Sequence, residues 1–447
     1  MAVELMVPEI EELVHKRMFA ELRAVLDELD EADVADVLEE LPEEEEAVVF
    51  RLLPRDRSAE VFSELDTEAQ TELLEKLSTE SVSEIINDML PDDRTALLEE
   101  LPAEVTQKLL STLSPEKLAV ARQLLGYPED SVGRLMTPQY VSLQPEMTAE
   151  QALAKIRRVG KNKETLNVLF LVDERRHLLG SVQLEDLVLA EPQQTLESLE
   201  EGSVVSIAAT EDREEAVRKA EHYDQLAIAV VDSRNILVGI VTIDDLIDVA
   251  EEEATEDIQK MGAVAALEAS YFGTSVLTLA RKRIGWLIAL FVAGSLTATV
   301  LHHFEKDFIA ATSLILFIPL IISSGGNSGS QSASLIIRGL AVQEISMAHW
   351  LRVLGRELSM GLLMGLVLAV FGFLRVWLWG MSLPIAAVVS AGLVVVVLMG
   401  TLAGALFPLL LKRLGFDPAI SSTPFIASFV DIVGIILYLS IAQAILN

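Results

Sequence analysis

The 447-residue sequence contains no cysteine, few aromatic residues and only 34 basic side chains against 68 acidic ones. The absence of cysteine excludes a disulfide framework, a thiolate metal site and a cysteine nucleophile. The six histidines are scattered, and no phosphate-binding loop or nucleophile–base motif is present. The first residues also lack the basic and apolar regions of a cleaved signal peptide. We therefore expect a protein that is not an enzyme and whose membrane insertion begins at an internal span.

Charge is distributed very unevenly along the chain. Residues 1–260 hold 61 acidic and 24 basic side chains, a net charge of −37, whereas residues 261–447 hold 7 and 10. Hydrophobic residues make up 51% of the chain, which is too apolar for a purely soluble protein. The length allows two or three domains. The sequence thus predicts an anionic soluble half followed by a membrane half, which suggests cations both as cargo and as signal.

Five apolar stretches are long enough to cross a membrane as helices. Basic residues cluster at 281–283, at 338–356 and at 412–413, with few on the alternate connections. The positive-inside rule then places the acidic half in the cytoplasm and Asn447 on the extracellular or periplasmic side. We expect a multi-pass protein of the cell (inner) membrane with spans near 284–303, 308–340, 358–379, 383–411 and 418–446.

The second span contains the polar, glycine-rich run SSGGNSGSQS at 323–332. Polar backbone at membrane depth is tolerated only where protein buries it or where it lines a wet cavity. We expect one long helix that is broken or tightly packed at Gly325, Gly326 and Gly329, with Asn327 and Gln331 turned away from lipid. Two interpretations remain open, pore lining and small-residue helix packing.

The fifth span contains Asp431, with no basic residue nearby in the run PFIASFVDIVGIILYLSIA. A charge in hydrocarbon is unfavourable by roughly 3 kcal/mol or more unless it faces water, a partner or an ion. Helical spacing puts Pro424, Ala427 and Ser428 on the same face as Asp431. An oxygen-only site of this kind suits hydrated Mg2+. The alternative is a protonated Asp431 that bonds to a neighbouring helix.

From about residue 30 to 125 the sequence repeats a short amphipathic helical unit with a period close to twelve. Residues that stop or cap helices separate the units. One unit cannot bury its apolar face alone, so the units must stack. The repeat predicts an all-α superhelix with an acidic exterior and boundaries at Pro42, Pro54, Asp66, Ser78, Pro91, Pro102 and Ser114.

Two copies of a mixed unit follow and end in parallel ways, LFLVDERRHLLGSVQLEDL at 169–187 and IAVVDSRNILVGIVTIDDL at 228–246. The tandem resembles a pair of CBS domains, which implies an α/β module. The resemblance implies that Thr242 and Asp245 contact the ribose of ATP or another adenine nucleotide. In the first copy, Gln183 replaces the usual Ser or Thr and Glu185 adds negative charge, which disfavours nucleotide binding.

The segment at 251–271 is expected to form a helix with Ile258, Met261, Val264 and Leu267 on one side. Five acids lead into it, more than a helix dipole needs. It connects the soluble half to the first span. We therefore divide the chain into an acidic helical-repeat N-domain (1–130), tandem CBS domains (131–250), a connecting, plug-like helix (251–280) and a five-helix transmembrane pore domain (281–447).

The order of these parts resembles the MgtE family of magnesium channels, as do the runs PLIISSGGNSGSQSASLIIR at 319–338 and DPAISSTPFIASFVDIVG at 417–434. The resemblance covers essentially the whole chain and implies a multi-domain fold with an all-α N-domain, an α/β CBS pair, a connecting helix and an all-α transmembrane domain. It also implies a homodimer whose pore runs along the dimer axis, where Asp431 from both subunits and the Ala427 carbonyl hold hydrated Mg2+. The further pore-lining candidates are Gly325, Gly326, Asn327, Gln331, Pro424 and Ser428.

The same resemblance implies feedback, in which cytoplasmic Mg2+ binds at several sites per subunit, cross-links the domains and closes the pore. Without divalent cations, so many like charges would push the domains apart, and bound cations would shift the population toward the closed state. The implied regulatory ligands are Asp88, Asp92, Asp212, Glu214, Asp224, Asp245, Asp248, Glu256, Asp257 and Asp417.

The first hypothesis is therefore a Mg2+-selective channel with membrane lipid and divalent cations as partners and no nucleic acid. An ion-coupled divalent cation carrier is the alternative within transport, although the five spans lack the internal pairing that inverted repeats produce. A CBS-containing membrane receptor without a pore is the alternative from another class. The polar face around Asp431 argues against the receptor, because a membrane anchor has no use for it.

Overall fold

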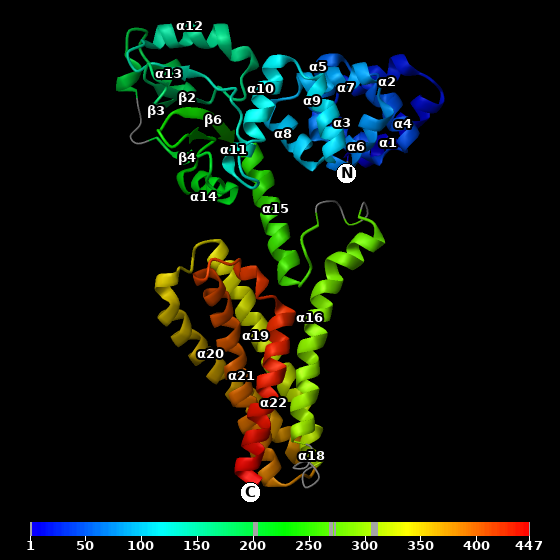
Figure 1. The fold of residues 1–447 in the computed structure, drawn as a ribbon, viewed down its shortest axis with the longest axis vertical. Helices are drawn as coiled ribbons and strands as arrows, with labels where there is room; N and C mark the ends of the chain where they lie inside the picture. The colour runs from blue at the N-terminus through cyan, green and yellow to red at the C-terminus, as the bar shows by residue number, and fades with distance from the viewer. Residues whose placement is uncertain (1, 200–203, 268–270, 272–273, 305–311, 447) are drawn as a thin grey trace. The chain divides into compact units, whose positions relative to one another are not determined.

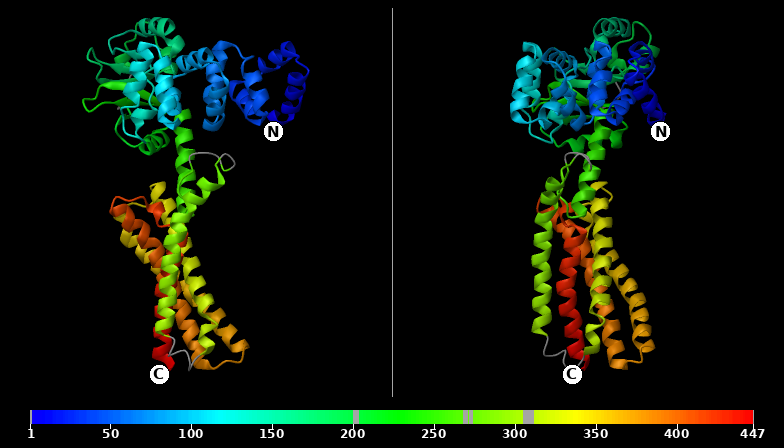
Figure 2. Two further views of the ribbon diagram at one scale, coloured as in Figure 1. Left: turned by 45° about the vertical axis from the view of Figure 1, so that its right-hand side comes forward. Right: turned by 90° about the vertical axis from the view of Figure 1, so that its right-hand side faces the viewer.

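The computed structural model describes residues 2–199, 204–267, 271, 274–304 and 312–446. Its contacts divide the chain into two units, 1–252 and 253–447. The first unit contains short helices followed by two small sheets, and the second contains the long apolar helices (Figures 1 and 2).

The N-terminal part of the first unit is a series of short helices, most of them separated by two residues. Alternate helices of the series pack against each other, so their apolar faces join in one core that contains Phe50 and Phe62. Asp66, Ser78 and Ser114 each accept a hydrogen bond from a backbone N–H three residues later, which begins a helix. The predicted superhelix is confirmed. Its helices are α1 (Ala2–His15), α2 (Phe19–Leu26), α3 (Glu31–Glu40), α4 (Glu43–Phe50), α5 (Arg55–Glu64), α6 (Thr67–Lys76), α7 (Thr79–Asp88), α8 (Pro91–Glu100), α9 (Ala103–Thr112) and α10 (Pro115–Leu124).

The two copies of the mixed unit form sheets of identical topology. In each sheet the first strand pairs parallel to the second and the second pairs antiparallel to the third, with a register shift near the end of the second strand. The predicted α/β pair is confirmed. The first copy contains α11 (Val132–Leu135), β1 (Ser142–Leu143), α12 (Ala149–Val159), η1 (Gly160–Asn162), β2 (Val168–Val172), β3 (Leu178–Gln183), α13 (Leu184–Leu189) and η2 (Leu196–Ser198). The second contains β4 (Ser206–Ala208), α14 (Arg213–Tyr223), β5 (Ala227–Val231) and β6 (Leu237–Thr242).

The helix expected at 251–271 has different limits in the structure. Helix α15 (Ile243–Met261) begins directly after β6 and ends ten residues earlier than expected. The physical reason is a C-terminal cap in which Ala263 adopts a left-handed φ of 58° and the Val264 N–H bonds to the Gln259 carbonyl. Val264 and Leu267 therefore lie beyond the helix, and residues 268–270 of the expected helix lie outside the described residues.

The second unit contains five helical segments that are long and apolar enough to cross a membrane, within the part of the chain that the structure describes. The predicted number of spans is confirmed. The helices are α16 (Val276–His303), α18 (Thr312–Ile315), α19 (Ile318–Ala341), α20 (Trp350–Leu378), α21 (Leu383–Arg413) and α22 (Thr423–Leu446), with short turns η3 (Met347–His349) before α20 and η4 (Pro418–Ile420) before α22. Helix α21 packs against α19, α20 and α22, while α16 packs beside α22 (Figure 2).

The glycine-rich run in the second span does not break its helix. Helix α19 is continuous from Ile318 to Ala341, and the interruption lies earlier, between α18 and α19; residues 308–311 of the expected span lie outside the described residues. A side chain on Gly400 would lie 2.3 Å from the Gly325 carbonyl oxygen, and one on Gly404 would lie 2.0 Å from that of Gly329. The glycines therefore allow the backbones of α19 and α21 to touch, as the packing interpretation requires.

Candidate ion-binding sites

Asp431 lies in the first half of α22 and is half-buried. No hydrogen bond or ion pair to its carboxylate is found among the described residues. Pro424, Ala427 and Ser428 precede it on the same helix, and all three are partly exposed. A side chain on Gly326 would lie 3.7 Å from Ala427, so α19 runs directly beside this stretch of α22. Asp431 is thus a carboxylate at membrane depth that no described residue neutralises.

Two faces of α19 differ sharply in polarity and exposure. Asn327 and Gln331 are exposed, whereas Ser328 and Ser332, each one residue further along, are buried. Among the other pore-lining candidates, Gly325 is buried, and a side chain there would lie 2.6 Å from Val396. Helix α19 therefore carries a polar exposed face that is distinct from its packing face.

A cluster of acids gathers where α8 of the N-terminal helices meets the CBS pair. Asp92 is only 5% exposed, and its Oδ1 has no hydrogen-bond partner among the described residues. Burial raises the pKa of Asp92 and nearby Asp245 raises it further. Burial, together with Asp244, Asp93 and Glu164, raises the pKa of Asp245 to about 7, although a 2.8 Å hydrogen bond from Thr242 opposes the change.

Three further acids at this contact, Glu164, Asp93 and Asp248, also have raised pKa values. Burial and the charges of Asp93 and Asp244 raise the pKa of Glu164 to about 7, and burial is also the main cause of the raised pKa values of Asp93 and Asp248. The cluster brings together two predicted regulatory residues, Asp92 and Asp245, with Asp248 close by. We call Asp92, Asp93, Glu164, Asp244 and Asp245 the interface acid cluster.

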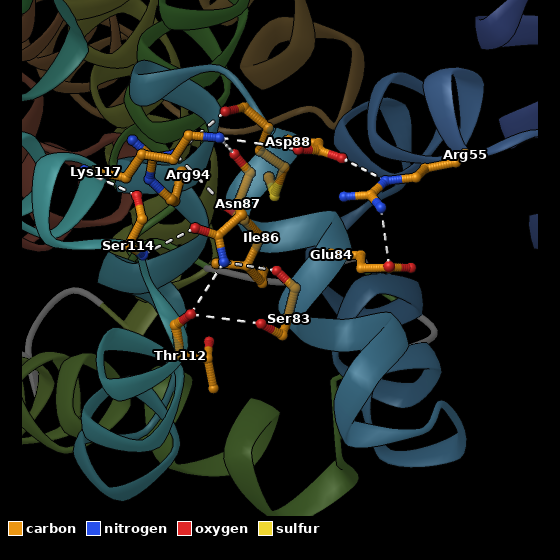
Figure 3. Close-up of polar contacts among 11 residues, drawn as sticks. Arg55, Ser83, Glu84, Ile86, Asn87, Asp88, Arg94, Thr112, Ser114 and Lys117 are labelled. Atoms are coloured by element: carbon orange, nitrogen blue, oxygen red, sulfur yellow. Dashed lines mark hydrogen bonds and ion pairs between the residues drawn. The ribbon is translucent and has the colours of Figure 1, made fainter.

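Asp88 lies in a different environment from Asp92. Its Oδ2 accepts a 3.0 Å hydrogen bond from Arg55 Nε, and the same guanidinium donates to Glu84 at 2.9 Å (Figure 3). Lys117 Nζ lies 3.9 Å from the other Asp88 oxygen. Asp88 thus already has two cationic neighbours, which would compete with a divalent ion.

Three predicted regulatory residues of the second CBS copy lie on or beside α14. Asp212 caps its N-terminus by accepting from the Glu214 backbone N–H, and Asp224 ends it in a left-handed conformation. The Glu214 side chain lies 3.1 Å from Arg218. The structure therefore gives Asp212 and Asp224 local structural roles and does not bring these three residues to the interface acid cluster.

Lys260 joins two other predicted ligands within the second unit. Its Nζ lies 2.6 Å from Glu256 and 2.8 Å from Asp417. Burial lowers the pKa of Lys260, but the hydrogen bonds and charges of Asp417 and Glu256 outweigh it and raise the pKa above its ordinary value. An ammonium group thus lies between two carboxylates that the resemblance implies as ligands of regulatory Mg2+. Asp257, the next acid on α15, also makes an interaction.

No group of three His, Asp or Glu side chains in the described residues has the geometry of a ready-made metal site. An ion that keeps most of its water shell needs few direct protein ligands, which is the usual mode for Mg2+. A lone Asp431 and loosely grouped acids are compatible with that mode.

Sequence reasoning missed several residues of these sites. Asp93 and Asp244 are next to the predicted ligands Asp92 and Asp245 in the sequence, and this proximity could have identified them. Glu164 lies in a loop of the first CBS copy, and no local pattern marks it. Glu357 is a second buried acid in the membrane helices, and its position in the first turns of a span gave only a weak signal.

The fold and the sites define a multi-pass membrane protein that carries a CBS pair and an acidic helical domain. The chain matches the model of the MgtE family, described as "Divalent cation transporter", over residues 318–441, that of the "MgtE intracellular N domain" over 29–130, and that of the CBS domain over 132–192 and 200–252. These matches cover each of the predicted parts except the connecting segment and the first span.

Full-length relatives are similar over most of the chain. A "Magnesium transporter MgtE" of Thermus thermophilus is 39% identical over 360 residues, 80% of each chain. A "Magnesium transporter MgtE" of Bacillus subtilis is 33% identical over 81% of this chain and 80% of its own length. A solved cytosolic domain of the Mg2+ channel MgtE in complex with ATP has a TM-score of 0.52 and 36% identity, covering 54% of this chain and 99% of that one.

The chain belongs to the MgtE family. The resemblance and the fold class are therefore confirmed. The prediction that the chain is not an enzyme is also confirmed, because the matched relatives are transporters.

Proposed function

We propose that the chain is a Mg2+-selective channel that mediates Mg2+ uptake as a homodimer across the cell membrane. The soluble half faces the cytoplasm, and Asp431 of both subunits holds hydrated Mg2+ with the Ala427 carbonyl. The names of the relatives from T. thermophilus and B. subtilis support Mg2+ as the cargo. The basic clusters at 281–283 and 412–413 support the orientation.

The observation that carries the proposal is the carboxylate of Asp431 at membrane depth, for which the described part of the chain offers no ion-pair or hydrogen-bond partner. In an isolated subunit, Asp431, Asn327 and Gln331 would be partly or fully exposed to lipid, which is unfavourable for polar groups. A second subunit that encloses these groups around water would remove that penalty. Helix α19 lies beside α22 at Gly326 and Ala427, so one pathway can include polar groups of both helices.

The test is Mg2+ flux into liposomes that contain the purified full-length protein. Asp431→Asn keeps the size of the side chain and removes its charge, and we expect at least a tenfold loss of flux, about 1.4 kcal/mol or more in ion stabilisation. Glu344→Gln, an exposed acid outside the helices, is the matched control. Wild-type flux through a folded Asp431→Asn protein would reject Asp431 as the pore ligand.

The same liposomes separate the channel from an ion-coupled carrier. A proton gradient imposed without a Mg2+ gradient should drive no Mg2+ movement through a channel. Mg2+ accumulation under that condition would favour the carrier, and the absence of any Mg2+ flux under either gradient would favour the receptor.

Closure by internal Mg2+ is the regulatory part of the proposal. The interface acid cluster supports it, because burial and mutual repulsion hold several of its carboxyls at raised pKa values that a divalent cation would relieve. We expect the combined change of Asp92, Asp245 and Asp248 to Asn to raise the internal Mg2+ concentration that half-inhibits uptake by at least tenfold. Unchanged inhibition would place the sensor among the other predicted ligands.

Binding of ATP at the CBS pair is a proposed addition, supported by the similar cytosolic domain whose structure contains ATP. Thr242 and Asp245 are hydrogen-bonded to each other, so a ribose would have to share or replace that bond. Equilibrium binding of labelled ATP to the purified protein is the direct measurement, with Thr242→Ala as the variant. Equal ATP binding by the Thr242→Ala protein would exclude this position.

A further inference from the structure

Glu357 is an acid of the third membrane-spanning segment that the proposed ion pathway does not use. It lies near the start of α20 and is 9% exposed. Its Oε2 accepts a 2.5 Å hydrogen bond from Ser332 Oγ of α19. One turn before Ser332, Ser328 is also buried, and its hydroxyl has no hydrogen-bond partner among the described residues. A carboxylate at this depth is retained only where it has a specific role.

The position of Glu357 among three helices indicates what that role is. Helices α19 and α20 both pack along α21 rather than along each other. On α20, a side chain at Gly361 would lie 2.3 Å from Thr401 Oγ1 of α21, so these two helices are locked closely together. Among the described residues, the bond between Glu357 and Ser332 is the only hydrogen bond that links α20 to α19.

The hydrogen bond between Glu357 and Ser332 restrains the rotation of α19 about its own axis. Successive residues of an α-helix are about 100° apart around the axis. Ser332 points into the helix bundle while Gln331 is exposed, and the same relation holds for Ser328 and Asn327. A hydrogen bond that holds Ser332 inward therefore holds Asn327 and Gln331 outward. Between Gly325 and Ala333 every buried residue of this face is small, so the bond adds a directional restraint to the close packing of α19 against α21.

We propose that Glu357 is a positioning residue for the pore: its hydrogen bond to Ser332 sets the rotation of α19 and so presents Asn327 and Gln331 to the ion pathway. The inference rests on the proposed function, because only a pore-lining α19 makes this orientation matter for transport. Glu357 acts through Ser332 and does not contact the ion.

The absence of cysteine from the chain permits a clean test by thiol labelling. Single cysteines are introduced as Asn327→Cys and Ser328→Cys in the full-length protein in liposomes and treated with a charged, membrane-impermeant thiol reagent. With Glu357 present, we expect the cysteine at 327 to react and the one at 328 to be protected. Glu357→Ala should lower labelling at 327 and raise it at 328, each at least fivefold.

Conservative variants distinguish positioning from general damage. Glu357→Gln keeps an oxygen that can accept the Ser332 hydrogen bond, so its labelling pattern should match that of the unchanged protein. Ser332→Ala removes the donor and should shift the pattern in the same direction as Glu357→Ala. Ser359→Ala, an exposed serine that bonds only within α20, is the control for mutation of this helix. If Glu357→Ala fails to fold, Ser332→Ala decides the question.

The outcomes separate this inference from the proposed function. A cysteine at 327 that stays unreactive in the presence of Glu357 would contradict pore lining by α19 itself. If the cysteine at 327 is reactive but the labelling of 327 and 328 in the Glu357→Ala and Ser332→Ala proteins equals that in the unchanged protein, the positioning role is overturned and the pore proposal stands.

Discussion

Neutralisation of Asp245 is expected to strengthen the contact between α8 and the CBS pair when no divalent cation is present. Asp245 is partly buried, and its pKa is raised from 3.8 to about 7 by burial and by neighbouring acids. A shift of about three pH units corresponds to at most about 4 kcal/mol of unfavourable charge at pH 8. The change Asp245→Asn removes the charge and keeps an oxygen that can accept the Thr242 hydrogen bond.

The sign of the pH dependence follows from proton binding. An acid whose pKa is raised in the folded state binds more protons folded than unfolded between the two pKa values. Stability therefore falls as pH rises from about 4 to about 7, with a limiting slope of about 1.4 kcal/mol per pH unit for each such carboxyl, and is constant above that range. Glu164, whose pKa is also about 7, adds to the same window.

Hydrogen–deuterium exchange of the full-length protein measures this effect at the site. After correction for the intrinsic pH dependence of exchange, amides of α8 should exchange faster at pH 8 than at pH 5.5 in divalent-free buffer. At pH 8, Asp245→Asn should slow that exchange at least tenfold, which is about 1.4 kcal/mol. Mg2+ should slow exchange in the unchanged protein and have less effect on the variant.

The internal repeat supplies a matched control. Asp186 of the first CBS copy occupies the position that Asp245 occupies in the second, in LEDL and IDDL respectively, and it is not part of the interface acid cluster. Asp186→Asn should leave the exchange of α8 unchanged. Equal exchange in the Asp245→Asn and unchanged proteins at pH 8, or an equal effect of Asp186→Asn, would refute the reasoning.

Two further predictions concern the second unit. Lys260→Met removes the cation between Glu256 and Asp417. Because both ion pairs are partly exposed, the loss of stability should be about 1 kcal/mol or less. Mg2+ uptake at low internal Mg2+ should nevertheless rise severalfold. Lys260→Arg should behave like the unchanged protein. Unaltered uptake by Lys260→Met would contradict the prediction that the ion pairs of Lys260 with Glu256 and Asp417 limit uptake. Gly404→Ala places a side chain 2.0 Å from the Gly329 carbonyl oxygen, so the backbones of α19 and α21 must separate, at a stability loss of about 2 kcal/mol or more. Thermal unfolding in detergent should show a lower midpoint for Gly404→Ala but not for Gly294→Ala, where a side chain meets nothing within 4 Å.

Local signals predicted the helical repeat and the duplicated sheets well. Caps at Asp66, Ser78 and Ser114 form the expected hydrogen bonds, because a cap depends on residues three positions apart. The end of α15 was missed for the opposite reason. The helix ends because Ala263 adopts a left-handed conformation, and apart from Gly262 the sequence has no helix-breaking residue at this point. The helical spacing of apolar residues continues past Ala263 to Leu267, so it predicts a longer helix.

Among the site residues, too, local sequence signals identified some and missed others. Asp431 could be chosen from the sequence because a carboxylate in an apolar run is conspicuous without any knowledge of its neighbours. The pairing of Lys260 with Asp417, 157 residues away, could not, since both residues look like ordinary charges near the ends of helices. Glu357 lies close to Arg356 in the sequence and resembles an interfacial acid until the structure shows it buried against Ser332.

By itself, the sequence determined the division into an anionic soluble half and an apolar half, the number of spans, the helical and α/β repeats, and Asp431 as the conspicuous acid. These features depend on composition and on short periodicities, which local physics imposes on any chain. Only the tertiary structure decided which acids meet. The interface acid cluster draws Asp92, Glu164 and Asp245 from three separate parts of the chain, and the rotation of α19 depends on a contact with α20. Burial and mutual repulsion arise from that proximity in space, which no local pattern encodes.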